Sequence, residues 1–106
     1  MDKDALTAWA LGNGWQMIAG FPSLTKPSRP KEAIVRIGLK ATVAILEIKK
    51  PAGKWEKIAS QSYGKILADP DTGLPLGLGF ETIPGFTMLM RENRDRMAFA
   101  KMTGTP

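Results

Sequence analysis

Residues 42–63 read TVAILEIKKPAGKWEKIASQSY, and they predict a β-hairpin around which the rest of the chain is organised. Apolar and polar residues alternate on both sides of residues 50–53 (KPAG), as they do in half-buried strands. Proline suits the second position of a type I turn, and Gly53 suits the left-handed position that forms a bulge. We therefore expect two antiparallel strands joined at a basic tip.

The charges of the two strands predict their register. A tight two-residue turn would place Glu47 opposite Glu56, and like charges that face each other destabilise a sheet. The bulged turn instead places Glu47 opposite Lys57 and Leu46 opposite Ile58, and both pairs are favourable. We therefore expect the bulged register.

The same register places Trp55 opposite Lys49, on the face of Ile45 and Ala59. Two roles are open to this side chain. It can cap the core, which is the commoner role of a tryptophan near a hairpin end, or it can stack on a ligand.

The residues before the hairpin predict three elements and a linker. A helix is expected over residues 4–12, with Asp2 or Asp4 as its N-cap and Gly12 or Gly14 as its left-handed stop. A strand over residues 15–21 follows. The proline-rich stretch SLTKPSRP, residues 23–30, is typical of a linker.

Residues 30–40 fit two structures. As a helix they start with a proline, and Glu32, Arg36 and Lys40 form one charged stripe. As a strand, apolar residues alternate with Arg36 and Lys40. A strand that continued to Lys50 would be about twice the usual upper length, with no turn signal to break it. We therefore expect a helix over 30–40, followed by the first strand of the hairpin.

The C-terminal third predicts a turn at residues 69–73 (DPDTG), a loop, and a last helix from about residue 83 to residue 101. One side of this helix should face the core, with Phe86, Leu89, Met90, Met97 and Ala100. The other side carries a second apolar set, Met88, Phe99 and Met102. The whole chain, residues 1–106, is expected to be a single α+β domain, with an antiparallel sheet, a central basic hairpin, and N-terminal, middle and C-terminal helices.

Composition limits the chemistry of the chain. Its 106 residues contain neither cysteine nor histidine, so disulfides, zinc–thiolate sites and the usual histidine-based catalytic triads are excluded. DPDTG resembles the start of a calcium loop but lacks the distal glutamate. We expect no enzyme activity, no metal and no cofactor. The weakest alternative is an enzyme that uses Tyr63 and Lys65 with Asp69 or Glu81.

The net charge of +5 is concentrated in one segment. Residues 26–65 carry +7, and the segments on either side carry −1 each. This asymmetry favours a non-enzymatic module that binds an acidic partner, nucleic acid first. Alternatively, the lysines only keep a sheet edge soluble. The expected binding residues are Arg36, Lys40, Lys49, Lys50, Lys54, Trp55 and Lys57.

A second hypothesis concerns the apolar residues Met88, Phe99 and Met102 of the last helix. An exposed Met/Phe surface favours association, so this side of the helix is expected either to be covered by residues 66–82 of the same chain or to contact a second copy of the chain or a partner protein. The chain has no apolar run long enough for a membrane span and no secretory signal pattern, so we expect a cytoplasmic protein.

Overall fold

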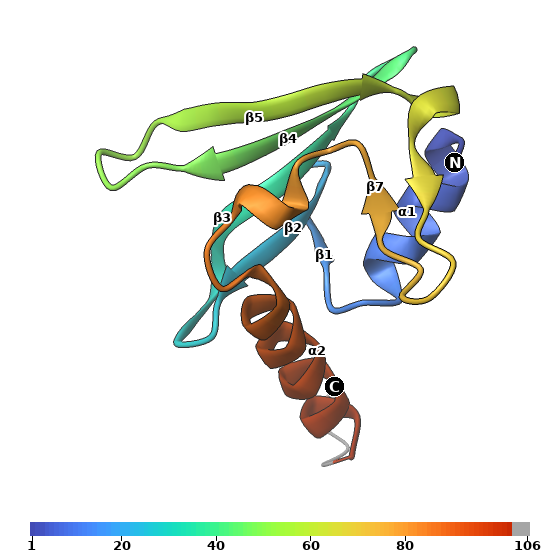
Figure 1. Cartoon of the computed structure of the whole chain (residues 1–106). Coiled ribbons are helices and arrows are strands. Elements are labelled where there is room, and N and C mark those ends of the chain that lie inside the picture. Colours follow the sequence, from blue (N-terminus) through green and yellow to red (C-terminus); the bar gives the residue numbers. More distant parts are fainter. Residues whose placement is uncertain (103–106) are drawn as a thin grey trace.

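A five-stranded antiparallel sheet forms the centre of the protein, as a computed structural model shows (Figure 1). The structure describes the backbone of residues 1–102 and the side chains of residues 1–98. Within these residues the chain forms two α-helices, so the α+β class is confirmed. In order, the elements are α1 (Lys3–Leu11), β1 (Gln16–Ile18), β2 (Phe21–Lys26), β3 (Arg29–Leu39), β4 (Val43–Lys49), β5 (Trp55–Ser62), the 3₁₀ turn η1 (Tyr63–Lys65), β6 (Leu67–Ala68), β7 (Pro75–Leu76), the 3₁₀ turn η2 (Phe80–Thr82) and α2 (Phe86–Met102).

The sheet has a covered face and an open face. Its strands follow the order β1-β2-β3-β4-β5, with each strand beside the next one in the chain. α1, η2 and the start of α2 contribute side chains to one core on the covered face. The buried residues of this core are Leu6, Ala10, Trp15, Leu24, Val35, Ile37, Ala44, Leu46, Ile66, Leu78, Phe80 and Phe86.

The predicted hairpin is present as β4 and β5. The amide of Gly53 donates a hydrogen bond to the carbonyl of Lys50 at 2.8 Å, and Gly53 has a φ of +88°. Glu47 lies opposite Lys57, as the bulged turn predicts. The proline, the glycine and the charges near the tip were therefore sufficient to give the register there.

A second bulge shifts the register further along the hairpin. Leu46 pairs with Ala59 and not with Ile58, because Ile58 is an extra residue in β5 between two paired positions. The prediction for Leu46 is wrong for this reason. Beyond such a bulge, the side chains of β5 point to the opposite faces from those that the uninterrupted register would give. Ala59 therefore lies on the same face as Leu46 and on the opposite face from Ile45.

The expected helix over residues 30–40 is wrong, because these residues lie in β3. β3 lies between β2 and β4 and pairs with both, so its backbone groups bond to neighbouring strands and not within a helix. The turn after it is closed by the amide of Lys40, which donates to the carbonyl of Val43 at 3.0 Å. Residues 40–42 (KAT) contain no glycine or proline, so the end of β3 carried no turn signal in the sequence.

The strand over 15–21 and the linker over 23–30 are also wrong. Ala19 and Gly20, with φ values of +52° and +86°, form a two-residue turn between β1 and β2. Positive φ at both positions is the conformation that suits a tight hairpin. Residues 23–30 then complete β2, a turn at residues 27–28 and the start of β3. The prolines are accommodated because the register of β2 and β3 is irregular there.

α2 is held to the sheet by one buried amide. Asn93 is fully buried, and its Oδ1 accepts hydrogen bonds from the amide and the hydroxyl of Thr25 at 3.0 and 3.2 Å. Its Nδ2 donates to the carbonyl of Thr25 at 3.0 Å and to that of Leu89 at 2.8 Å. Thr25 lies where the pairing of β2 and β3 shifts. The side chain of Asn93 therefore bonds to the backbone amide and carbonyl of Thr25, as a neighbouring strand would elsewhere in the sheet. The sequence analysis missed this residue, although it falls on the predicted core face of the helix.

α1 begins and ends as expected. The carboxylate of Asp2 accepts a hydrogen bond from the amide of Ala5 at 2.7 Å, which is an N-cap. Gly14, with a φ of +91°, supplies the left-handed residue after the helix, whereas Gly12 stays right-handed.

Candidate functional site

The open face of the sheet is centred on the side chain of Arg36. Its guanidinium carbon lies 4.3 Å from the centre of the Phe21 ring and 4.0 Å from the centre of the Trp55 ring. Its Nε donates to Oε1 of Glu47 at 2.9 Å, and both side chains are only about one-fifth exposed. Two aromatic rings and a carboxylate thus hold the guanidinium in one orientation.

Trp55 therefore does not cap the core. It lies opposite Lys49, as predicted, but on the open face with Arg36. The expectation that it shares a face with Ala59 is wrong because the bulge at Ile58 turns Ala59 toward the core. Since Trp55 packs on Arg36, this part of its ring is not available to a base.

A shallow depression of about 360 Å³ lies beside this stack. Arg36, Trp55 and the buried Ser23 form part of its lining. Lys31 and Lys49 also line it, and both are exposed. Lys31 was not among the predicted site residues, although it belongs to the basic segment 26–65.

Lys57 belongs to the same face. It lies opposite Glu47, and cross-strand partners share a face. The carboxylate of Glu47, however, accepts its hydrogen bond from Arg36. We name the set Lys31, Arg36, Lys49, Trp55 and Lys57 the outer basic face.

The remaining predicted basic residues lie elsewhere. Lys50 pairs with Glu56 at 2.6 Å and lines a different groove, on the core side of the hairpin. Lys54 is exposed within the tip. Lys40 lies in the turn at the other end of β4, a seven-residue strand that spans about 20 Å, so it is not part of the outer basic face.

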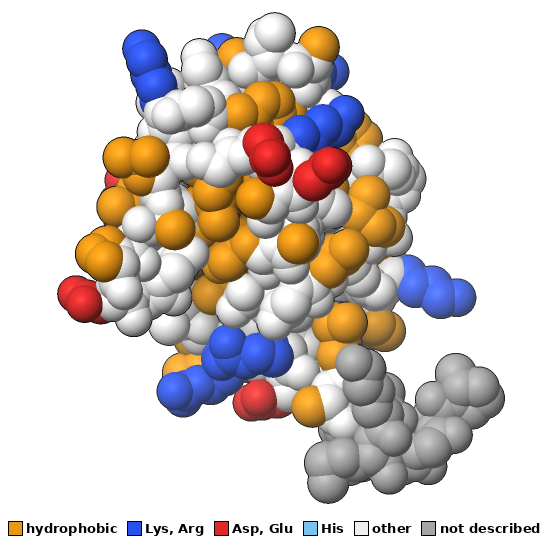
Figure 2. Space-filling view, turned by 90° about the vertical axis from the view of Figure 1, so that its right-hand side faces the viewer, with side chains coloured by type: hydrophobic (Ala, Val, Ile, Leu, Met, Phe, Trp, Pro, Cys, Tyr) orange, Lys and Arg blue, Asp and Glu red, His pale blue; other side chains and the backbone are white. Residues whose placement is uncertain are grey.

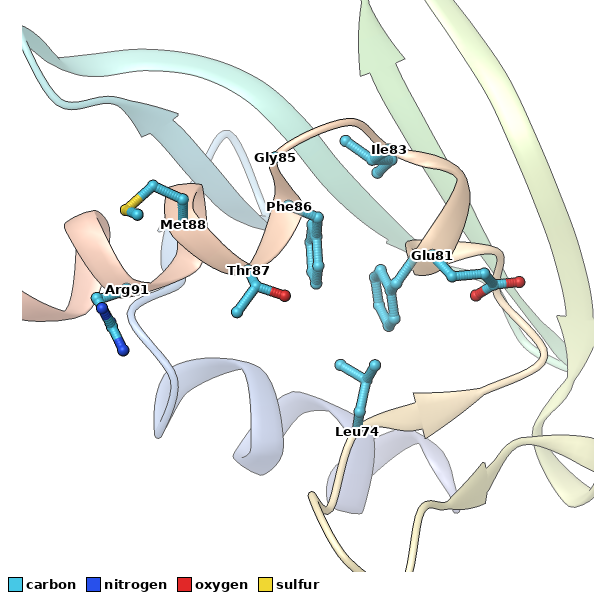
Figure 3. Close-up of a pocket in the computed structure, with 9 residues that line it drawn as sticks. Leu74, Glu81, Ile83, Gly85, Phe86, Thr87, Met88 and Arg91 are labelled. Carbon is cyan, nitrogen blue, oxygen red and sulfur yellow. The ribbon is translucent and has the colours of Figure 1, made fainter.

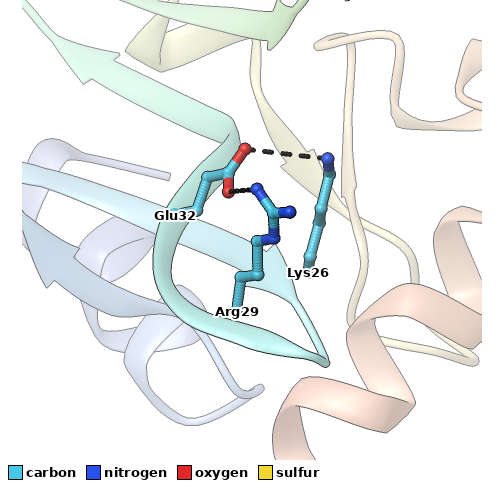
Figure 4. A network of polar contacts seen from close by, with 3 residues as sticks. All are labelled: Lys26, Arg29 and Glu32. Atoms are coloured by element: carbon cyan, nitrogen blue, oxygen red, sulfur yellow. Dashed lines mark hydrogen bonds and ion pairs between the residues drawn. The ribbon is translucent and has the colours of Figure 1, made fainter.

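Glu32 lowers the positive charge at the start of β3. Its carboxylate lies 3.1 Å from Arg29 Nη1 and 3.6 Å from Lys26 Nζ (Figure 4). The hydrogen bond from Arg29 holds the pKa of Glu32 below its usual value, and the charges of Lys26 and Arg29 act in the same direction. With Arg36 and Lys50, which pair with Glu47 and Glu56, four of the ten basic residues in the segment therefore have an acidic partner.

A different face of the molecule is largely apolar. Figure 2 shows this face, with hydrophobic side chains gathered in its middle and lysines and arginines in separate places around them. A cavity of about 540 Å³ opens between β7 and the start of α2. Leu74 and Phe86 point into it, and Glu81 points away from it (Figure 3). Met88 also lines it and is 54% exposed.

The other two predicted interaction residues, Phe99 and Met102, lie outside the residues whose side chains the structure describes. The described part of this surface therefore consists of Met88 and the cavity beside it.

The residues proposed for an enzyme have structural partners. The Tyr63 hydroxyl donates to the carbonyl of Lys40 at 2.7 Å, and burial raises its pKa. Tyr63 and Lys65 lie at the two ends of η1. Asp69 accepts hydrogen bonds from the amides of Asp71 and Thr72 within the predicted turn, and these bonds lower its pKa.

Among the described residues, no group of three or more acidic side chains is arranged to hold a metal ion. None of the helices described is both long and apolar enough to cross a membrane. No protein-family model, curated protein or solved structure matches this chain.

Proposed function

We propose that the protein is a non-enzymatic module that binds nucleic acid through the phosphate backbone, on the outer basic face. The observation that carries this proposal is the orientation of Arg36. Its guanidinium is fixed by two rings and by Glu47, and it lines a depression together with Lys31 and Lys49. A guanidinium that is already ordered loses little entropy when it binds a phosphate.

The packing of Trp55 favours phosphate contacts over base stacking. One side of its ring lies on Arg36, so the tryptophan positions a cation more than it offers a platform. Binding through phosphates is largely independent of sequence and falls steeply with salt. A cytoplasmic location, where nucleic acid is present, belongs to the same proposal.

Fluorescence anisotropy with labelled single-stranded DNA, single-stranded RNA and duplex DNA, each at 50 and 200 mM salt, tests this function. We expect binding that weakens between the two salt concentrations. The double variant Lys49→Gln/Lys57→Gln should weaken binding and reduce the slope of log affinity against log salt by about 1 to 2. No binding at low salt, or binding that salt leaves unchanged, refutes the proposal.

The matched control is Lys40→Gln/Lys65→Gln. It removes the same charge from exposed positions at the other end of the sheet. We expect this control to lose no more affinity than the loss of one phosphate contact would cause. Equal losses in the two double variants would show that net charge, and not the outer basic face, determines binding.

The exposure of Met88 supports a second candidate function, the association of two copies of this chain through α2 and the apolar cavity beside it. An exposed methionine next to an apolar hollow is a surface that association would cover. Sedimentation over a concentration series should then show a dimer that Met88→Glu abolishes. The control is Met17→Glu, at a methionine of β1 that is 49% exposed. A monomer at all concentrations refutes this candidate.

A further inference from the structure

A second groove lies on the core side of the hairpin, where β3 and β4 extend past α2. Ile34 and Ile48 form part of its floor, and Ile83, Pro84 and Leu89 form the facing wall. Its volume is about 560 Å³. Ile34, Ile48, Ile83 and Leu89 pack against the core but stay partly exposed, so the groove continues the core outward. We name it the inner groove.

The rim of the inner groove is basic. Lys26, Lys49 and Lys50 line it, and Glu32 is the acidic residue of the lining. Lys26 lies 3.6 Å from Glu32, and Lys50 pairs with Glu56, which lies outside the lining. The side chains of Lys26 and Lys50 are 50% and 47% exposed. Exposed pairs of this kind are weak, so a ligand anion can compete for either ammonium.

An apolar floor with a cationic rim is complementary to an apolar chain that ends in an anion. We propose that the inner groove binds a small amphipathic anion, namely an acyl chain with a terminal carboxylate. The chain would lie along Ile34, Ile48 and Leu89, and the carboxylate would accept hydrogen bonds from the lysines.

The size of the groove favours a small molecule over a partner protein. Ligand pockets are usually about 300–1,000 Å³, and the inner groove falls in that range. A stable protein interface uses about 20–30 residues on each side, which is more than this groove offers. The inner groove shares Lys49 and Glu32 with the depression beside the outer basic face, but its apolar lining, Lys26 and Lys50 belong to it alone. This inference therefore does not depend on nucleic-acid binding.

NMR titration of the ¹⁵N-labelled protein with monomeric decanoate tests the inference. Two probes separate its parts: decyltrimethylammonium has the same tail with a cationic head, and acetate has the carboxylate without the tail. We expect decanoate to shift the amides of Ile34, Ile48, Ile83 and Leu89. Decyltrimethylammonium should bind about tenfold or more weakly, and acetate should produce no saturable shift at the same concentrations.

A matched pair of variants separates the rim from net charge. Lys26→Gln/Lys50→Gln should weaken decanoate binding about fivefold and leave decyltrimethylammonium binding no weaker. Lys40→Gln/Lys65→Gln removes the same charge at a distance and should leave decanoate affinity within twofold. Lys49 stays intact in both variants because it lines both surfaces. Circular dichroism of each variant confirms that it is folded.

Three results would overturn the inference. They are the absence of a saturable decanoate shift, equal affinities for the anionic and cationic probes, and shifts confined to the cavity beside Met88 and Leu74. Nucleic-acid binding by Lys26→Gln/Lys50→Gln should change less than that by Lys49→Gln/Lys57→Gln, so the failure of one proposal is distinguishable from the failure of the other.

Discussion

The guanidinium carbon of Arg36 lies 4.0 Å from the centre of the Trp55 ring, and this contact joins β3 to the start of β5 across β4. The centre of the Phe21 ring in β2 lies 4.3 Å from the same guanidinium carbon. Three strands are thus joined on the open face by one cation between two rings.

Arg36→Lys should destabilise the protein by about 1 kcal/mol. Lysine keeps the charge but loses the planar stack and the Nε hydrogen bond to Glu47. Urea unfolding of Arg36→Lys, Trp55→Leu and the double variant forms a double-mutant cycle. We expect a coupling of about 0.5–1 kcal/mol between the two residues. Additive effects within about 0.3 kcal/mol would contradict a direct stack.

Asn93→Ala should destabilise the protein by about 3 kcal/mol, because the amide and carbonyl of Thr25 would lose their buried partner. Asn93→Asp should be at least as harmful, since a carboxylate cannot donate to the Thr25 carbonyl and its charge would be buried. Urea unfolding measures both variants. The control is Asn13→Ala, because the Asn13 amide donates only to the carbonyl of Trp9 in a more exposed place. Similar effects of Asn13→Ala and Asn93→Ala would show that Asn93 does not hold α2.

Gly14→Ala and Gly53→Ala should differ although both glycines have a positive φ, of +91° and +88°. A Cβ on Gly14 would lie 2.6 Å from the backbone nitrogen of Arg94, so α2 would have to move away from the α1 end. A Cβ on Gly53 would meet no atom within 4 Å. We expect a loss of about 3 kcal/mol for Gly14→Ala and about 1 kcal/mol for Gly53→Ala, measured by thermal unfolding. Equal losses of stability in the two variants would mean that backbone strain, and not the contact with Arg94, accounts for both.

Asp69 should contribute to stability at neutral pH and not in acid. Hydrogen bonds from Asp71 and Thr72 lower its pKa below the ordinary value of 3.8, so the folded state favours the carboxylate. The contribution is present above the pKa of the unfolded chain and is lost as the pH falls through the lower pKa of the folded chain. The variant Asp69→Asn keeps a hydrogen-bond acceptor but does not titrate. The difference in unfolding free energy between the unaltered protein and Asp69→Asn should therefore shrink from pH 5 to pH 2. A constant difference would contradict this role.

The hairpin was predictable because its signals are local. Pro51 and Gly53 favour one turn type, and Glu47 and Lys57 select its register within a few residues of that turn. The start of α1 was predictable for the same reason, since Asp2 caps an amide three residues away. Local conformational preferences and near-neighbour charges are properties of short segments.

β3 was not predictable in this way. Its pattern fits a helix or a strand, and its partners on both sides, β2 and β4, favoured the strand. The turn at residues 40–42 lacks glycine and proline, and the turn at residues 19–20 has Gly20 but holds Ala19 at a positive φ, so both form because the strands beside them pair. The predicted binding residues separated for the same reason. Lys40 and Lys49 lie at opposite ends of β4, and Lys50, which follows β4, pairs with Glu56.

The sequence by itself determined the α+β class, the basic hairpin with its bulged tip, and the excess of positive charge in residues 26–65. Only the tertiary structure decided which of those charges share a surface, and it placed Lys31 beside Arg36 and Lys49. It also decided that Trp55 packs on Arg36 and that Asn93 completes the bonding of Thr25. The physical reason is that these relationships depend on strand pairing and bulges, which bring together residues that no local preference connects.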